Sequence, residues 1–171
     1  TLINKSVSSH HVWKQTSLDR RIDILNQFLD EVVSHKETIC QRLSIEMGRP
    51  IKYCYGEING FLERAKFMIE IAPAYLRDIT IFNNTTTTKA IHRVPLGVIL
   101  IIPAWNYPYL TSINSLITAL LSGNSVIFKG SSQTPFTGEI YQKCFRSAGL
   151  PENVFTNLYL DHKTTGKIVS D

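Results

Sequence analysis

The sequence lacks the features that would assign it to a functional class at once. Its 171 residues contain no apolar run long enough to cross a membrane. They contain no block of Lys and Arg typical of nucleic-acid binding, although the formal net charge is +4 and the pI is about 9.0. The common phosphate-loop spacings GxxxxGKS/T and GxGxxG are missing too. We therefore expect a soluble globular chain with no membrane partner and no nucleic-acid partner.

Cysteine is scarce and follows no pattern. Cys40, Cys54 and Cys144 form no CxxC pair, and no His/Cys cluster has metal-ligand spacing. Scattered thiols of odd number are typical of a reducing compartment, where they are buried and inert. We expect no metal site and, since no targeting signal is visible, a cytoplasmic location. No histidine pairs recognisably with Ser, Cys or Asp, and we expect His10 and His11 to lie in a solvated tail.

The first part of the chain, residues 1–78, is predicted to be helical. Apolar residues recur at steps of three and four in 17–35 and again in 52–76. A further helix between these two is expected to end at Gly48. No nucleophile–base arrangement is visible in this part, so we look for chemistry further along the chain.

The composition changes at residue 79. The segment 79–95 is rich in β-branched residues and is broken by Asn-Asn, which predicts a hairpin or a pair of edge strands. Four consecutive threonines, at 85–88, suit a solvent-facing strand or a pairing surface. These strands are candidates for oligomerisation.

Residues 96–171 alternate between apolar runs and helical segments. The runs "GVILII" (97–102), "SVIFK" (125–129) and "NVFTNL" (153–158) are predicted to be strands, separated by helices of about a dozen residues. This order predicts a parallel sheet with right-handed crossovers. Such sheets are covered on both faces, so we expect a bare face or edge unless further chain covers it.

One candidate site residue follows the first of these strands. Asn106 lies in "PAWNYP" (103–108), at the carboxyl end of a parallel strand, where open α/β sheets bind ligands. Its neutral amide can donate two hydrogen bonds and suits an oxyanion that forms on a carbonyl substrate. Alternatively, Asn106 caps the helix that begins near Tyr109 or organises the turn.

A second candidate follows the next strand, in "VIFKGSSQTP" (126–135). Lys129 ends the strand, and Gly130, Ser131 and Ser132 lead into a helix N-terminus. A cation, free hydroxyls and helix amides together can bind an anion or a ribose. Alternatively, Lys129 is a solvated lysine at a strand end.

The run "HRVPLGVILIIPAWNYPYLTSINSLITALLSGNSVIFKGSSQTP" (92–135) closely resembles the aldehyde dehydrogenase superfamily. In that family an Arg-x-Pro-x-Gly-Val strand leads into Pro-Trp-Asn-x-Pro, followed by a helix ending in Gly-Asn and by Lys-Pro-Ser-Glu-x-Thr-Pro. "EMGRP" (46–50), "GEI" (56–58) and "AGLPENVFTNL" (148–158) are similar to further family segments. The resemblance covers nearly the whole chain in the right order. It implies an α/β fold with amino-terminal helices, a β-hairpin and half of a Rossmann-like parallel sheet.

The resemblance also implies a reaction and a site. Family members oxidise an aldehyde to a carboxylic acid with NAD or NADP: a Cys thiolate attacks the carbonyl, hydride leaves to the nicotinamide, and a Glu-activated water releases the acid. Asn106 matches the family's oxyanion donor, and Lys129 matches the lysine that holds the adenine ribose. The remaining cofactor contacts implied by the resemblance are Ile102, Pro103, Ala104, Trp105, Ser131 and Ser132.

Two positions depart from the family pattern in the ribose loop. Gly130 replaces a Pro, and Ser132 replaces a Glu whose carboxylate grips both ribose hydroxyls and repels a 2′-phosphate. A neutral hydroxyl removes that repulsion. We therefore expect NADP to be tolerated or preferred.

The family's catalytic Cys and Glu motifs would fall after residue 171. We expect the chain to be the amino-terminal portion of a homo-oligomeric aldehyde dehydrogenase, without its catalytic domain and inactive alone; the missing initiator Met also suggests trimming at the front. The alternative is a small, non-catalytic nucleotide-binding or assembly module derived from that family. The intact mass of the natural protein distinguishes the two.

Overall fold

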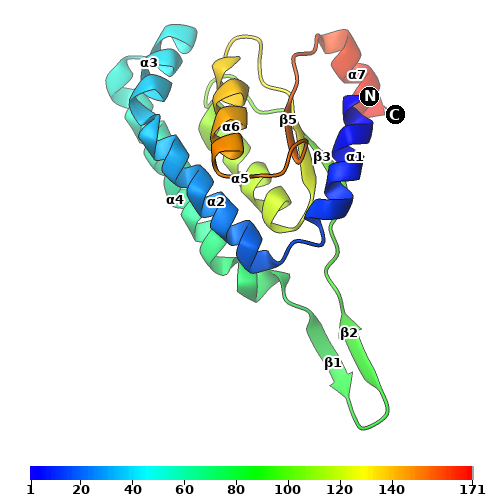
Figure 1. The fold of residues 1–171 in the computed structure, drawn as a ribbon. Coiled ribbons are helices and arrows are strands. Elements are labelled where there is room, and N and C mark those ends of the chain that lie inside the picture. Colours follow the sequence, from blue (N-terminus) through cyan, green and yellow to red (C-terminus); the bar gives the residue numbers. More distant parts are fainter. Residues whose placement is uncertain (171) are drawn as a thin grey trace.

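The computed structural model describes residues 1–170, which form seven helices, a two-stranded antiparallel sheet and a three-stranded parallel sheet (Figure 1). The expected α/β class is confirmed. The elements in chain order are α1 (Leu2–Trp13), α2 (Leu18–Ser34), α3 (Lys36–Met47), α4 (Ile51–Leu76), β1 (Ile79–Asn83), β2 (Thr88–Ile91), β3 (Val98–Ile101), α5 (Pro108–Leu121), β4 (Ser125–Phe128), α6 (Phe136–Ser147), β5 (Phe155–Asn157) and α7 (His162–Ser170).

The parallel sheet has the order β3-β4-β5, and its strands end level with one another. Ile101 pairs with Phe128, and Phe128 pairs with Asn157. The backbone N–H of Lys129 donates to the carbonyl of Ile101 at 2.9 Å, so the hydrogen bonding between β3 and β4 continues to the ends of both strands. The loops that follow β3, β4 and β5 therefore all leave from one edge of the sheet.

Helices α5 and α6 pack on one face of this sheet, with α2 and α4 outside them. An aromatic cluster fills the interior, and fully buried Tyr141 lies at its centre, 5.4 Å from the ring of Tyr109 and 5.5 Å from that of Phe128. Burying such a side chain contributes about 1.5–3 kcal/mol. Because Tyr109 is in the first turn of α5, the core fixes the start of that helix and hence the end of the β3–α5 loop.

The other face of the sheet is covered by α1, and here the expectation of a solvated tail is wrong for His10. Residues 2–13 form a helix whose buried stripe is Ser6, His10 and Trp13. The Trp13 indole N–H donates to the carbonyl of Leu120 at 3.1 Å, and His10 Nδ1 lies 3.1 Å from that of Gly123. The sequence shows no apolar period over this helix, because two of its three buried residues are polar. The helix covers the second face of the sheet, so neither face of the parallel sheet is bare.

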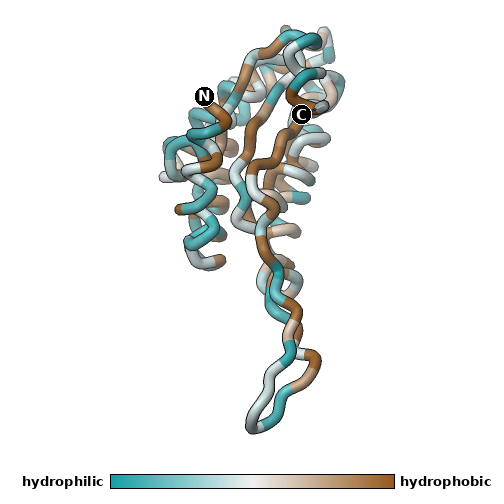
Figure 2. Tube along the Cα trace, turned by 90° about the vertical axis from the view of Figure 1, so that its right-hand side faces the viewer, coloured by the Kyte–Doolittle hydropathy of each residue, from teal (hydrophilic) through white to brown (hydrophobic). Residues whose placement is uncertain are grey.

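The hairpin β1–β2 extends away from the helical body (Figures 1 and 2). All five residues of β1 are exposed, so neither face of this two-stranded sheet is covered. The threonine run at 85–88 mostly forms the connecting turn: Asn84 Oδ1 accepts hydrogen bonds from the backbone N–H of Thr86 and Thr87, and only Thr88 belongs to a strand. An isolated hairpin of this kind has little stability of its own.

The three cysteines are buried, as expected. Burial raises the pKa of Cys40 to about 11 and that of Cys144 to about 12, so both remain protonated thiols at neutral pH. Among residues 1–170 no group of His, Cys, Asp and Glu is arranged to hold a metal ion. Within the same range, no helix combines the length and the apolar character that a membrane crossing requires.

Candidate functional site

The β3–α5 loop presents its side chains to solvent at the carboxyl edge of the sheet. Ile102, Ala104 and Trp105 are exposed, and Pro103 is half-buried. Ile102 follows Ile101, whose carbonyl accepts the N–H of Lys129, so the first residues of two predicted cofactor segments lie next to each other. The register of the strands accounts for this placement.

Asn106 is exposed, and its side-chain amide makes no hydrogen bond with any residue in 1–170. The residue that caps α5 is Tyr107, which provides no side-chain hydrogen bond. Asn106 therefore does not cap α5, and this alternative is wrong. Its amide is turned to solvent, and only its backbone carbonyl is bonded to the protein.

The amides at the start of α5 are bound instead by Glu57, a buried residue of α4. Glu57 Oε1 accepts hydrogen bonds from the backbone N–H of Tyr109 at 2.9 Å and of Leu110 at 3.3 Å. A carboxylate at a helix N-terminus satisfies unpaired donors and interacts favourably with the helix dipole. Burial raises the pKa of Glu57, although Arg49 and the two backbone N–H groups act in the opposite direction.

Arg49, between α3 and α4, connects this carboxylate to the loop. Its Nη1 donates to Glu57 Oε2 at 2.6 Å, and its Nη2 donates to the backbone carbonyl of Asn106. The guanidinium also lies over the ring of Tyr107, 4.1 Å from its centroid. One side chain thus binds α4 and two successive residues of the β3–α5 loop.

Reasoning from the sequence assigned no role to Arg49 or Glu57. Both lie in segments quoted only for their family resemblance. A usable signal was present nevertheless: Glu57 falls at helical spacing between Cys54 and Phe61, which are buried. A charge within an apolar stripe needs a partner of opposite sign, and Arg49 is that partner.

The β4–α6 loop borders a small hollow at the same edge of the sheet. Its lining residues are Gly130, Ser131, Ser132, Pro135, Asn157, Tyr159 and Leu160, and none of them is acidic. Lys129 precedes them and is largely buried. Tyr159 itself donates a hydrogen bond to Glu139, in the first turn of α6, at 2.8 Å. The hydroxyl residues Ser131 and Ser132 thus line the hollow without a carboxylate beside them, and Lys129 directly precedes this loop in the chain.

Asn157 is a hollow-lining residue that the sequence reasoning did not select. It ends β5 and lies against Gly138 of α6, where an added Cβ would be 2.0 Å from Asn157 Oδ1. Only a glycine at position 138 allows this close approach. An Asn at the end of a buried strand was the available signal.

These observations define a class of protein first: a three-stranded parallel sheet with helices on both faces and polar side chains in the loops at its carboxyl edge is part of an open α/β fold. The particular family follows from comparison. The sequence profile of the aldehyde dehydrogenase family matches residues 1–171, and the chain belongs to this family.

Curated relatives are similar over most of this chain. A malonate-semialdehyde dehydrogenase of Listeria monocytogenes serotype 4a (strain HCC23) is 28% identical over 159 residues, which is 93% of this chain and 33% of the relative. An N-succinylglutamate 5-semialdehyde dehydrogenase of Novosphingobium aromaticivorans is 28% identical over 142 residues, or 83% and 30%. Both are oxidoreductases, and the chain spans about a third of their length.

Solved structures share the fold. A succinic semialdehyde dehydrogenase from Streptococcus pyogenes, in complex with NADP+, superposes with a TM-score of 0.89 at 18% identity, over 99% of this chain and 37% of that one. An NAD-dependent benzaldehyde dehydrogenase from Corynebacterium glutamicum gives a TM-score of 0.88 at 27% identity, over 98% and 37%. The set of structural neighbours therefore includes proteins with either cofactor.

Proposed function

We propose that this chain is the amino-terminal, cofactor-binding part of an NAD(P)-dependent aldehyde dehydrogenase that oxidises an aldehyde to a carboxylic acid. In this proposal residues 1–78 are its helical part, 79–95 its oligomerisation hairpin and 96–171 half of its dinucleotide-binding region. The observation that carries the proposal is the level ending of β3 and β4. It brings an unpaired amide and a cation with two hydroxyls to the same edge of the sheet.

In the complete enzyme we assign Asn106 the role of oxyanion donor. Its amide is exposed and unbonded within 1–170, so it can donate to a negatively charged oxygen without first breaking a protein hydrogen bond. A neutral donor stabilises charge that develops during the reaction and does not trap a charged ground state. This chain alone supplies the donor but no nucleophile, so we expect it to be inactive by itself.

The donor set at the β4–α6 loop fits a nicotinamide dinucleotide. Lys129, Ser131 and Ser132 would hold the adenine ribose, and Ile102, Pro103, Ala104 and Trp105 would line the cofactor at the end of β3. When bound, the cofactor accepts a hydride from the substrate. Because no acidic residue lines the hollow, a ribose with a 2′-phosphate is accepted as readily as one without.

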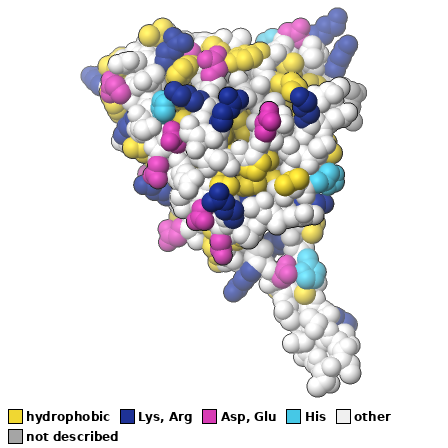
Figure 3. All heavy atoms as spheres, viewed as in Figure 1, with side chains coloured by type: hydrophobic (Ala, Val, Ile, Leu, Met, Phe, Trp, Pro, Cys, Tyr) yellow, Lys and Arg dark blue, Asp and Glu magenta, His cyan; other side chains and the backbone are white. Residues whose placement is uncertain are grey.

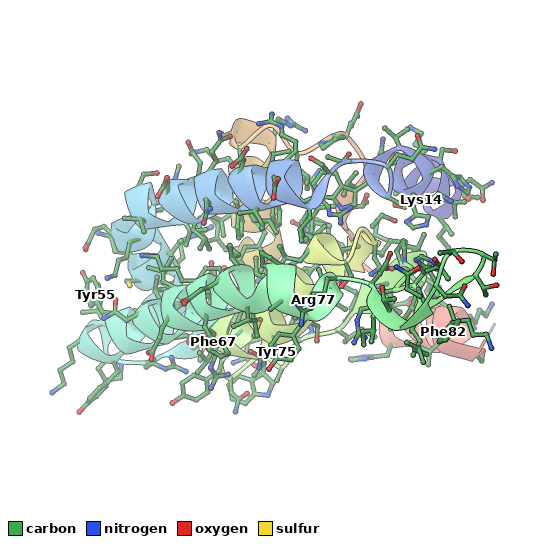
Figure 4. The ribbon with its side chains drawn as sticks, turned by 90° about the horizontal axis from the view of Figure 1, so that it is seen from below. Lys14, Tyr55, Phe67, Tyr75, Arg77 and Phe82 are labelled. Carbon is green, nitrogen blue, oxygen red and sulfur yellow. The ribbon has the colours of Figure 1, made fainter. Side chains whose placement is uncertain are left out.

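The exposed apolar side chains support a homo-oligomer. Phe67 and Tyr75 lie along one edge of α4, and Phe82 lies on the hairpin (Figure 4). Charges of both signs are interspersed over the helical body, whereas few lie on the hairpin (Figure 3). An uncovered two-stranded sheet with few charges is suited to pairing with a second subunit.

The test uses the untagged protein from its source. Its intact mass is measured first, and then the reduction of NAD+ and NADP+ is followed with malonate semialdehyde, succinate semialdehyde and benzaldehyde. We expect a mass several-fold above 19.4 kDa and turnover with an aldehyde. Asn106→Ala is expected to lower kcat about 100-fold or more, and Lys129→Ala to raise KM for the cofactor. Arg20→Met, an exposed change on α2, serves as the control.

A mass near 19.4 kDa without turnover would refute the dehydrogenase proposal. The alternative, a small module that binds nucleotides or mediates assembly, would then be favoured by the projecting hairpin. A full-length protein that oxidises aldehydes equally well after Asn106→Ala would refute the role of Asn106 and leave the family function intact.

A further inference from the structure

The loop that carries Asn106 makes few interactions that fix its position. Ala104, Trp105 and Asn106 are exposed, and the capping residue of α5 has no side-chain hydrogen bond. An oxyanion donor must nevertheless be placed to within a fraction of an ångström, because hydrogen-bond geometry determines its effect. The position of Asn106 must therefore be set by groups outside the loop.

The first of these groups is the Glu57 carboxylate. Its side chain is fully buried, and one of its oxygens binds the first free amides of α5, those of Tyr109 and Leu110. This contact fixes the start of α5 relative to α4, only three residues after Asn106. The second carboxylate oxygen is left for Arg49.

Arg49 carries this fixed point one step further along the chain. The planar guanidinium donates to Glu57 with one nitrogen and to the Asn106 carbonyl with the other, while its face lies on the Tyr107 ring. Its side chain is only 14% exposed and that of Glu57 is fully buried, so the Arg49–Glu57 contact is shielded from competing water. Because Arg49 binds the backbone carbonyl of Asn106, the side-chain amide of Asn106 stays available for a ligand.

From this arrangement we propose that Arg49 and Glu57 are positioning residues for the oxyanion donor. They act through Asn106 and touch neither substrate nor cofactor, and the inference rests on the catalytic role proposed for Asn106. A lysine cannot replace Arg49, because a single ammonium lacks the planar fork that reaches Glu57 and the Asn106 carbonyl together. Glu57→Gln keeps an acceptor for the α5 amides but removes the charge that orients the guanidinium.

A double-mutant cycle in the complete enzyme tests the proposal. Asn106→Ala, Arg49→Met and their combination are compared, with Arg20→Met as the control. We expect Arg49→Met to lower kcat by about 10- to 100-fold, with KM for the cofactor changed less than about threefold. In the Asn106→Ala background the same change should lower kcat by less than about threefold, because its effect depends on that amide.

The possible outcomes separate the two proposals. Equal losses from Arg49→Met in both backgrounds would overturn the positioning role, because they would show an effect that does not pass through Asn106. An unchanged kcat in Arg49→Met, beside a large loss in Asn106→Ala, would overturn it as well. An unchanged kcat in Asn106→Ala would overturn the catalytic role of Asn106 and the positioning role with it.

A second measurement applies if Arg49→Met folds poorly. Arg49→Lys and Glu57→Gln are examined by hydrogen exchange of the backbone amides in peptides covering residues 102–110. We expect exchange there to be about tenfold faster or more, with the exchange of α2 unchanged. Unchanged protection of 102–110 in both variants would overturn the proposal without any kinetic measurement.

Discussion

Replacing Ser132 by Glu tests the proposed cofactor selection at one of the two loop positions, 130 and 132, that differ from the expected family pattern. Ser132 is exposed, so the added carboxylate would act through a solvent-like dielectric. In water, two unit charges about 5 Å apart repel by about 0.8 kcal/mol, and a phosphate monoester carries a charge of about −1.5 to −2. The added repulsion toward a 2′-phosphate is therefore about 1.2–1.7 kcal/mol, or about tenfold in Kd.

Isothermal titration of the complete protein with NAD+ and NADP+ measures this effect. We expect Ser132→Glu to weaken NADP+ binding about tenfold without weakening NAD+ binding, and we expect the discrimination to shrink at about 1 M salt, where the Debye length is about 3 Å. Ser132→Gln has the size of Glu without its charge and should leave NADP+ binding nearly unchanged. An equal loss in Ser132→Gln would refute the electrostatic argument. Binding of NAD+ at least tenfold more tightly than NADP+ by the unaltered protein would refute the proposed tolerance.

Three further outcomes follow from the structure. Burial lowers the pKa of His10. The contribution of neutral His10 to the free energy of unfolding is therefore complete above about pH 6.5 and is lost as the pH falls below that value. Between pH 7.5 and 5.5 the melting temperature should fall further for the unaltered protein than for His10→Asn. Gly138→Ala would place a Cβ against Asn157 and should cost about 1–3 kcal/mol in urea unfolding, whereas Gly166→Ala, which meets nothing within 4 Å, should be neutral or stabilising. Ile81→Lys, at a position 66% exposed, should lower the oligomeric mass measured by light scattering while the melting temperature of the subunit changes little.

The elements that follow a simple apolar period were predicted well. The three strands of the parallel sheet lie within the runs 97–102, 125–129 and 153–158, and each is one or more residues shorter than expected. Lys129 was singled out because it ends a predicted strand, and Asn106 because it lies in the turn that follows one. The register of a parallel sheet places the ends of its strands at one edge whatever the helices do. The catalytic role of Asn106 and the cofactor role of Lys129 remain predictions.

The missed features are those for which tertiary contacts outweigh the pattern. In α1 the buried positions include Ser6 and His10, whose polar groups are satisfied by partners more than 100 residues away. The link from Glu57 through Arg49 to Asn106 joins residues up to 57 positions apart, and no local spacing encodes it. The useful signals in such a chain are a charged residue at helical spacing among apolar residues, such as Glu57, and polar residues that recur at helical spacing, such as Ser6 and His10.

The attachment of α1 has a consequence for the order in which the chain folds. Ser6 accepts a hydrogen bond through its carbonyl from Ser125 Oγ, 119 residues away, and its hydroxyl lies 3.4 Å from that of Thr156, 150 residues away. Closing such long loops costs entropy that is recovered only when the partner strands are in place. Helix α1 is synthesised before the strands that it contacts, and it is therefore expected to be among the last of the described elements to pack. Until β5 has been synthesised, the apolar face that α1 will cover lies open, and a nascent chain halted before residue 156 should be a chaperone client.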